Sequence, residues 1–85
     1  MDKSTFTREY DVLREMLRAE REKAELSQVA LAQRLKETQS FVSKVERGER
    51  RLDLVQLRIF CQAIGVSLTS FVSAFESRLG DRRRR

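Results

Sequence analysis

Residues 26–51, LSQVALAQRLKETQSFVSKVERGERR, constrain the fold more than any other part of the chain. They contain two short stretches whose apolar residues recur at helical spacing. Only Lys36, Glu37 and Thr38 separate the two stretches. So short a link forces neighbouring helices to cross at a sharp angle. The segment therefore predicts a pair of short, angled helices.

Both short helices have residues that are typical of helix ends. Ser27 is a good N-cap for a helix over 28–35, and Thr38 is a good N-cap for a helix over 39–47. Gly48 is expected to end the second helix, since glycine readily adopts the left-handed conformation at a helix C-terminus.

Three further helices are predicted outside this segment. The first extends over about 7–24, the fourth begins at Asp53 and stops at Gly65, and the fifth extends over about 68–79. Gln56 completes a capping-box pattern with Asp53. Proline is absent and β-branched runs are few, so the sequence predicts an all-α fold. A single domain over residues 1–81 is expected, because 85 residues do not suffice for two.

Apolar residues at helical spacing are expected to face one core. In the first helix they are Phe6, Tyr10, Leu13 and Leu17; in the second, Val29, Leu31, Ala32 and Leu35; in the third, Val42 and Val45; in the fourth, Leu54, Leu57, Phe60, Cys61 and Ile64; in the fifth, Leu68 and Phe71. The stripe of the fifth helix also includes Val72, and Phe75 and Leu79 continue it past the point where the core should end. Phe41 remains open between partly buried packing and an apolar contact with a ligand.

The charge of the chain is informative only locally. The net charge is +5, of which Arg82–Arg85 supply four units, and this basic tail is expected to be disordered. A cluster beside the third helix is more specific, and it contains Lys44, Arg47, Arg50 and Arg51. Such a local cluster indicates an anionic partner.

The third helix also has one polar face. Gln39, Ser40, Ser43 and Lys44 lie on it, opposite Val42 and Val45. A helix of this kind anchors itself with one side and offers hydrogen bonds and positive charge with the other. The major groove of double-stranded DNA fits that description best.

Several classes of function are excluded by composition. The chain has one cysteine and no histidine, so neither an internal disulfide nor a metal-ligand cluster of known spacing is expected. No Ser–His or Cys–His pair and no glycine-rich phosphate loop is present, so we expect neither an enzyme nor a cofactor. No apolar run approaches the roughly 18 residues of a membrane span, and no signal peptide is evident. A cytoplasmic protein of a bacterium or phage, with no membrane contact, is expected.

The motif LSQxxLAxxL, followed by TQSFVSKVERGER, resembles the Cro/C1-type, or Xre-type, helix-turn-helix family over about residues 12–72. The caps, the small residue Ala32, the apolar positions and the E-x-G motif at Glu46–Gly48 all fall in register. The resemblance implies a five-helix, lambda-repressor-like DNA-binding domain, with the helix-turn-helix over about 28–47.

The resemblance also implies residue roles. Gln28 would bind a backbone phosphate and brace the recognition helix, Gln39 would bind an adenine, and Lys44 would favour a guanine. The expected base-reading residues are Gln39, Ser40, Ser43 and Lys44. The expected backbone contacts are Gln28, Lys36, Thr38, Arg47, Arg50 and Arg51. Arg21 and Glu46 match a structural ion pair that ties the first helix to the third.

Two positions depart from the family's pattern. Relatives usually have glycine where this chain has Glu25 and Lys36, and both positions tend to need a positive φ. A residue with a side chain costs roughly 1 kcal/mol there. Lys36 either compensates as a phosphate contact or is simply tolerated.

A homodimer is expected, because one recognition helix covers too few base pairs for useful specificity. The fifth helix offers the interface through Val72, Phe75 and Leu79. The first helix, through Phe6 and Tyr10, is expected either to pack against the fifth helix or to join the interface. The function that follows is a transcriptional regulator, expected to repress from a palindromic operator. Phage repressor, restriction–modification controller and antitoxin remain open, and an antitoxin would also bind a toxin. The alternative is a helical module that binds protein or RNA and has lost operator recognition.

Overall fold

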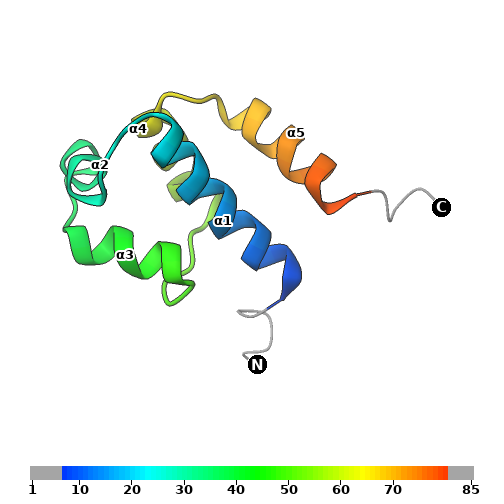
Figure 1. The fold of residues 1–85 in the computed structure, drawn as a ribbon, viewed down its shortest axis with the longest axis horizontal. Coiled ribbons are helices and arrows are strands. Elements are labelled where there is room, and N and C mark those ends of the chain that lie inside the picture. Colours follow the sequence, from blue (N-terminus) through cyan, green and yellow to red (C-terminus); the bar gives the residue numbers. More distant parts are fainter. Residues whose placement is uncertain (1–6, 81–85) are drawn as a thin grey trace.

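The computed structural model describes residues 7–80, which form five α-helices and no strand (Figure 1). The helices are α1 (Arg8–Lys23), α2 (Gln28–Leu35), α3 (Gln39–Arg47), α4 (Leu54–Ile64) and α5 (Leu68–Leu79). The predicted all-α, five-helix fold is confirmed. Phe6 and the tail Arg82–Arg85 lie outside the described residues.

The longest helix, α1, lies at the centre of the arrangement. It packs against α3 on one side and α5 on the other, while α4 packs against α2 and α5 (Figure 1). The closely joined pair α2 and α3 occupies one end of the molecule, and α5 extends away from it. The polar face of α3 is therefore left at the surface.

Side-chain caps explain why the helices begin where they do. Ser27, Thr38 and Ser67 each accept a hydrogen bond from the backbone N–H three residues later, at 3.0 Å. Asp53 and Gln56 form the predicted capping box, at 2.8 and 2.9 Å. Each cap satisfies an N–H that has no partner inside the helix.

One hydrophobic core joins all five helices. Its buried residues are Val12, Met16, Leu17, Leu31, Ala32, Val42, Val45, Phe60, Cys61, Ile64 and Phe71. Cys61 is fully buried and packs as a small apolar residue. Burial, with a smaller contribution from the charge of Glu20, raises the pKa of its thiol to about 11.

Two residues expected in the core are instead at the surface. Val29 is 52% exposed and Leu54 is 67% exposed. At about 100° per residue, Val29 lies roughly 115° from the centre of the stripe formed by the other apolar residues of α2. Leu54 lies in the first turn of α4, roughly 70° from the centre of its stripe. Both positions therefore face away from the neighbouring helices.

Candidate nucleic-acid interface

The turn between α2 and α3 depends on two backbone devices. Lys36 adopts the left-handed conformation, with φ 59° and ψ 43°, and ends α2. The N–H of Glu37 then donates to the carbonyl of Ala32 at 2.9 Å. Thr38 starts α3 at once, because its hydroxyl accepts from the N–H of Phe41. Lys36 and Thr38 both remain exposed beside the start of α3.

Interlocking residues behind the turn fix the angle between the two helices. Leu31 and Ala32 on α2 are buried, as are Val42 and Val45 on α3. Ala32 is 3% exposed, so a larger side chain would have no room there. The buried half of α3 therefore fixes which residues face outward.

The outward face of α3 presents the four predicted base-reading residues together. Gln39, Ser40 and Lys44 are exposed, and Ser43 is half-buried. Their positions along a single helix face give a row of amide, hydroxyl and ammonium groups. That set of donors and acceptors matches what base edges offer in the major groove.

A chain of side-chain hydrogen bonds connects this face to α1. Both oxygens of the Glu46 carboxylate accept from Arg21, whose Nε and Nη2 donate at 2.6 and 3.0 Å. Gln28 Nε2 donates to Glu46 Oε1 at 2.9 Å, and Gln39 Nε2 donates to Gln28 Oε1 at 2.7 Å. The amide of Gln39 is thus held by the first residue of α2.

Arg21 and Glu46 are both buried, at 8% exposed each. The hydrogen bonds to Glu46 raise the pKa of the Arg21 guanidinium, against the opposing effect of burial. Arg21 Nη1 also donates to the carbonyl of Leu26 at 2.8 Å, between α1 and α2. The pair therefore ties three helices together behind the polar face.

The arginines beyond α3 are held by aromatic rings. The guanidinium carbon of Arg50 lies 5.0 Å from the centre of the Phe41 ring, and that of Arg51 lies 4.8 Å from the centre of the Tyr10 ring. The Tyr10 hydroxyl donates to the carbonyl of Arg50 at 3.3 Å. Both arginines are exposed, so each can face a phosphate while its position is restrained.

Arg47 differs from the other predicted backbone contacts. Its Nε and Nη2 donate to the two carboxylate oxygens of Glu49, at 3.0 and 3.1 Å. Its Nη1 donates to the hydroxyl of Ser43. The hydrogen bonds between Arg47 and Glu49, together with their opposite charges, raise the pKa of Arg47 and lower that of Glu49. Its charge is therefore already paired in the free protein.

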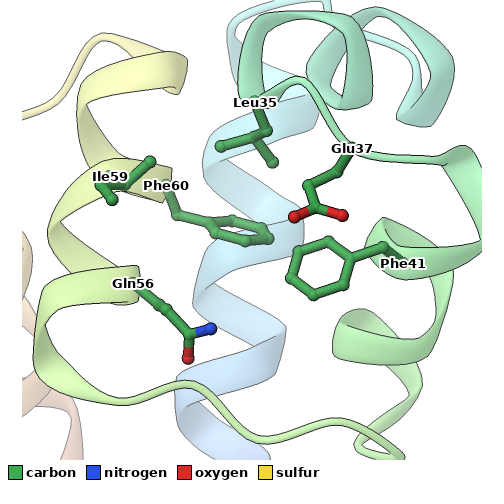
Figure 2. A pocket seen from close by; sticks show the side chains of 6 residues that line it. All are labelled: Leu35, Glu37, Phe41, Gln56, Ile59 and Phe60. Atoms are coloured by element: carbon green, nitrogen blue, oxygen red, sulfur yellow. The ribbon is translucent and has the colours of Figure 1, made fainter.

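A shallow pocket of about 210 Å³ lies between the turn, α3 and α4 (Figure 2). It is lined by Leu35, Glu37, Phe41, Gln56, Ile59 and Phe60. The rings of Phe41 and Phe60 have their centres 6.1 Å apart. Phe41 thus packs against the core edge, which favours the packing role over a ligand contact. The pocket is smaller than the usual small-molecule site.

The predicted interface residues of α5 are only partly available. Phe75 and Leu79 are half-buried and pack against the core of the same chain, whereas Val72 is 38% exposed. Arg78 on α5 donates to Glu15 on α1 at 3.0 Å. Part of the apolar stripe predicted to bind a second subunit is therefore already covered within the same chain. Three other exposed apolar residues, Leu54, Val55 and Ile59, lie together on α4.

Two residues near the polar face were missed in the sequence. Arg14 Nη1 donates to the carbonyl of Glu46 at 3.0 Å and so satisfies the end of α3. Glu49 pairs with Arg47. Both residues lie in stretches of alternating charge, and such stretches usually form a solvated surface. Only the exact position of α3 relative to its neighbours distinguishes these residues.

Residues 7–80 contain no group of three His, Cys, Asp or Glu side chains that could hold a metal ion. Over the same residues no single helix is both long and apolar enough to cross a membrane. Helices α4 and α5 reach that length and composition only together, and they are bent by 106° at their junction.

Comparison with protein families gives a match over the region that contains this site. A model described as helix-turn-helix matches residues 17–71, which is more than half of the chain. The match begins in α1 and ends in α5. No curated protein matches significantly.

Solved structures resemble the whole arrangement of helices. An XRE-family like protein from Pseudomonas syringae pv. tomato str. DC3000 is 39% identical, over 85% of this chain and 88% of that chain, with a TM-score of 0.79. A point mutant of the restriction–modification controller protein C.Esp1396I is 19% identical over 86% and 92%, with a TM-score of 0.78. The clp gene regulator ClgR from C. glutamicum is 20% identical over 87% and 95%, with a TM-score of 0.75. At such identities the last two show the fold alone.

Proposed function

Because the chain belongs to the Cro/C1-type, or Xre, helix-turn-helix family, we propose that it is a transcriptional repressor that binds a palindromic operator as a homodimer. The observation that carries the proposal is the hydrogen-bond chain from Arg21 to Gln39. It connects the buried ion pair to the first residue of the exposed polar face. Such support is useful when a side chain has to meet a base edge in one orientation.

The proposed contacts divide into two groups. Gln39, Ser40, Ser43 and Lys44 bind base edges, with the Gln39 amide matched to adenine and Lys44 to guanine. Gln28, Lys36, Thr38, Arg50 and Arg51 bind the phosphate backbone around them. Arg47 was predicted with this second group, but we leave it out, because its charge is paired with Glu49 in the free protein.

Selection of bound duplexes from a random pool tests sequence-specific binding. The chain is compared with the double variant Gln39→Ala/Lys44→Ala at roughly 150 mM salt, where purely electrostatic binding is weak. We expect the chain to enrich an inverted repeat that the variant loses or changes. The variant Gln62→Ala/Lys23→Ala is the control, since it removes the same two groups from exposed positions on α4 and α1.

A result without enrichment, with binding that only weakens as salt rises, would overturn the proposal. It would favour the alternative of an antitoxin or another helical module that binds protein or RNA. Enrichment of a single half-site without its inverted copy would overturn the palindrome and the dimer, while sequence-specific binding would stand.

The proposed dimer interface is the outer side of α5, with Val72 at its exposed centre and Phe75 and Leu79 beside it. An exposed apolar side chain gains most when a partner covers it. Val72→Glu is expected to yield a monomer in sedimentation velocity. Ser70→Glu adds the same charge to the opposite side of α5 and is expected to leave the dimer intact.

The exposed residues of α4 offer the competing surface. Leu54, Val55 and Ile59 are 67, 66 and 47% exposed. If Val55→Glu dissociates the dimer and Val72→Glu does not, the interface lies on α4 and the assignment to α5 is wrong.

A further inference from the structure

Ser43 is part of a short relay on the outer face of α3. Its hydroxyl oxygen accepts a hydrogen bond from Nη1 of Arg47, one helical turn later. Arg47 is in turn fixed by Glu49, which accepts from Nε and Nη2 at 3.0 and 3.1 Å. The half-buried serine is thus the end of a chain Glu49–Arg47–Ser43.

The relay reduces the hydrogen-bond donors and the net charge that Arg47 can present to a ligand. Three hydrogen-bonding nitrogens of its guanidinium already have partners within the protein. The adjacent carboxylate also neutralises its charge. The Nε/Nη2 edge, which would clamp a phosphate with two hydrogen bonds, is taken by Glu49, and the two remaining N–H groups carry a compensated charge. Arg47 is therefore better suited to orient Ser43 than to bind the DNA backbone.

The relay also fixes the polarity of Ser43. A serine hydroxyl has one O–H donor and two acceptor lone pairs, and in isolation it can serve as either. Here Arg47 takes one of the two lone pairs, and accepting from a cation polarises the hydroxyl so that it is a stronger donor and a weaker acceptor. Within residues 7–80 the structure gives no hydrogen bond in which the Ser43 hydroxyl is the donor. Its hydrogen is therefore available to an outside partner.

We propose that Arg47, fixed by Glu49, is a positioning residue that makes Ser43 a hydrogen-bond donor to the base it meets in the major groove. The proposal rests on the proposed function of base reading by α3. Guanine, adenine and thymine each present an acceptor in that groove, as N7, O6 or O4, whereas cytosine presents only its amino donor. Ser43 therefore selects against cytosine on the strand that it faces.

The test is the base distribution selected by the chain and by three variants. Arg47→Met removes the donor to Ser43 and keeps the apolar stem. Ser43→Ala removes the hydroxyl, and the double variant removes both. Arg18→Met is the matched control, because Arg18 pairs with Glu22 at 3.0 Å and both are as exposed as Arg47 and Glu49.

We expect Arg47→Met to admit cytosine at one position of each half-site. Discrimination at that position should fall about threefold to tenfold, as for the loss of one ordinary hydrogen bond. Ser43→Ala should have the same effect, and the double variant should add nothing further. The position bound by Gln39 should not change, and Arg18→Met should change no position.

Two results would overturn the inference while base reading stands. The first is an unchanged distribution for Arg47→Met with a salt dependence of log K reduced by about one unit, which marks a phosphate contact. The second is an additive effect in the double variant. If the unchanged protein enriches no sequence at all, the proposed function itself is overturned. If it still selects a base at the position bound by Gln39, base reading stands and only the role of Arg47 is in question.

Discussion

The guanidinium of Arg21, in α1, donates to both carboxylate oxygens of Glu46, in α3, and the two side chains are buried together. Glu46 also accepts from Gln28, so its charge has three donors. The same carboxylate therefore closes the core behind α3 and supports Gln28, which holds Gln39. Damage to this pair has consequences for both stability and binding.

Removing one partner of the pair should be strongly destabilising. Glu46→Ala removes both carboxylate hydrogen bonds of the buried Arg21 guanidinium and leaves it only the exposed carboxylate of Glu22 at 3.9 Å. Breaking a buried pair costs about 3–5 kcal/mol in comparable cases. The free energy of unfolding from urea titrations measures the loss. The exposed pair of Arg18 and Glu22 provides the control, and Arg18→Ala, which leaves Arg21 untouched, should cost no more than about 1 kcal/mol. Equal losses for the two variants would contradict this account.

Gln28 and Gln39 should act as one unit in DNA binding. Because Gln39 Nε2 donates to Gln28 Oε1 at 2.7 Å, Gln28→Ala releases the amide that is proposed to bind adenine. In a double-mutant cycle of operator affinity, the coupling between Gln28→Ala and Gln39→Ala should reach about 0.5–3 kcal/mol. Independent effects of the two substitutions would show that the hydrogen bond does not support binding.

Relief of backbone strain should separate the two roles left open for Lys36. Its φ of 59° is easy for glycine and strained for other residues. Lys36→Gly should raise stability by roughly 0.5–1 kcal/mol. Lys36→Ala removes the same charge and keeps the strain, so it should not stabilise. An operator affinity lowered equally by both changes would identify Lys36 as a phosphate contact, and an unchanged affinity would show that it is merely tolerated there.

Glu25 offers a second test of the same strain, away from α3. Its φ is 62°, and Glu25→Gly should raise the midpoint of thermal unfolding by a few degrees. Operator affinity should remain as it was, because Glu25 lies between α1 and α2. A midpoint that falls would show that the Glu25 side chain itself stabilises the loop.

The buried thiol of Cys61 should make stability sensitive to alkali. Its pKa is raised from 9.0 to about 11, so folding favours the protonated form. The resulting stabilisation is complete below pH 9 and is lost as the pH rises from 9 to 11, by up to about 2–3 kcal/mol. Cys61→Ala should remove this part of the pH dependence. An identical pH dependence in the variant would assign it to other groups.

Much of the fold could be predicted because its signals are local. Ser27, Thr38 and Asp53 act on N–H groups three residues away, and Gly48 ends α3 through its own φ of 83°. The outward face of α3 follows from the same local periodicity. These features need no knowledge of the rest of the molecule.

The remaining features depend on how helices meet. Arg14 contacts the end of α3 from 32 residues away, and no local pattern distinguishes it from the solvated arginines of α1. The pairing of Arg47 with Glu49 depends on the path of the chain after Gly48. The exposure of Val29 and Leu54 depends on how wide a stripe of each helix is covered by its neighbours. Periodicity shows which residues share a face, and packing decides how far that face is covered.

The hydrogen bond between Gln39 and Gln28 also separates two of the proposed base-reading residues by conformational entropy. Gln39 is ordered before DNA arrives, whereas the ammonium of Lys44 has no hydrogen bond within residues 7–80. Ordering a long side chain costs about 1–2 kcal/mol at the moment of binding. The side chain of Gln39 loses this entropy when the protein folds, whereas that of Lys44 would lose it only when the complex forms. Temperature should therefore weaken discrimination by Lys44 sooner than discrimination by Gln39.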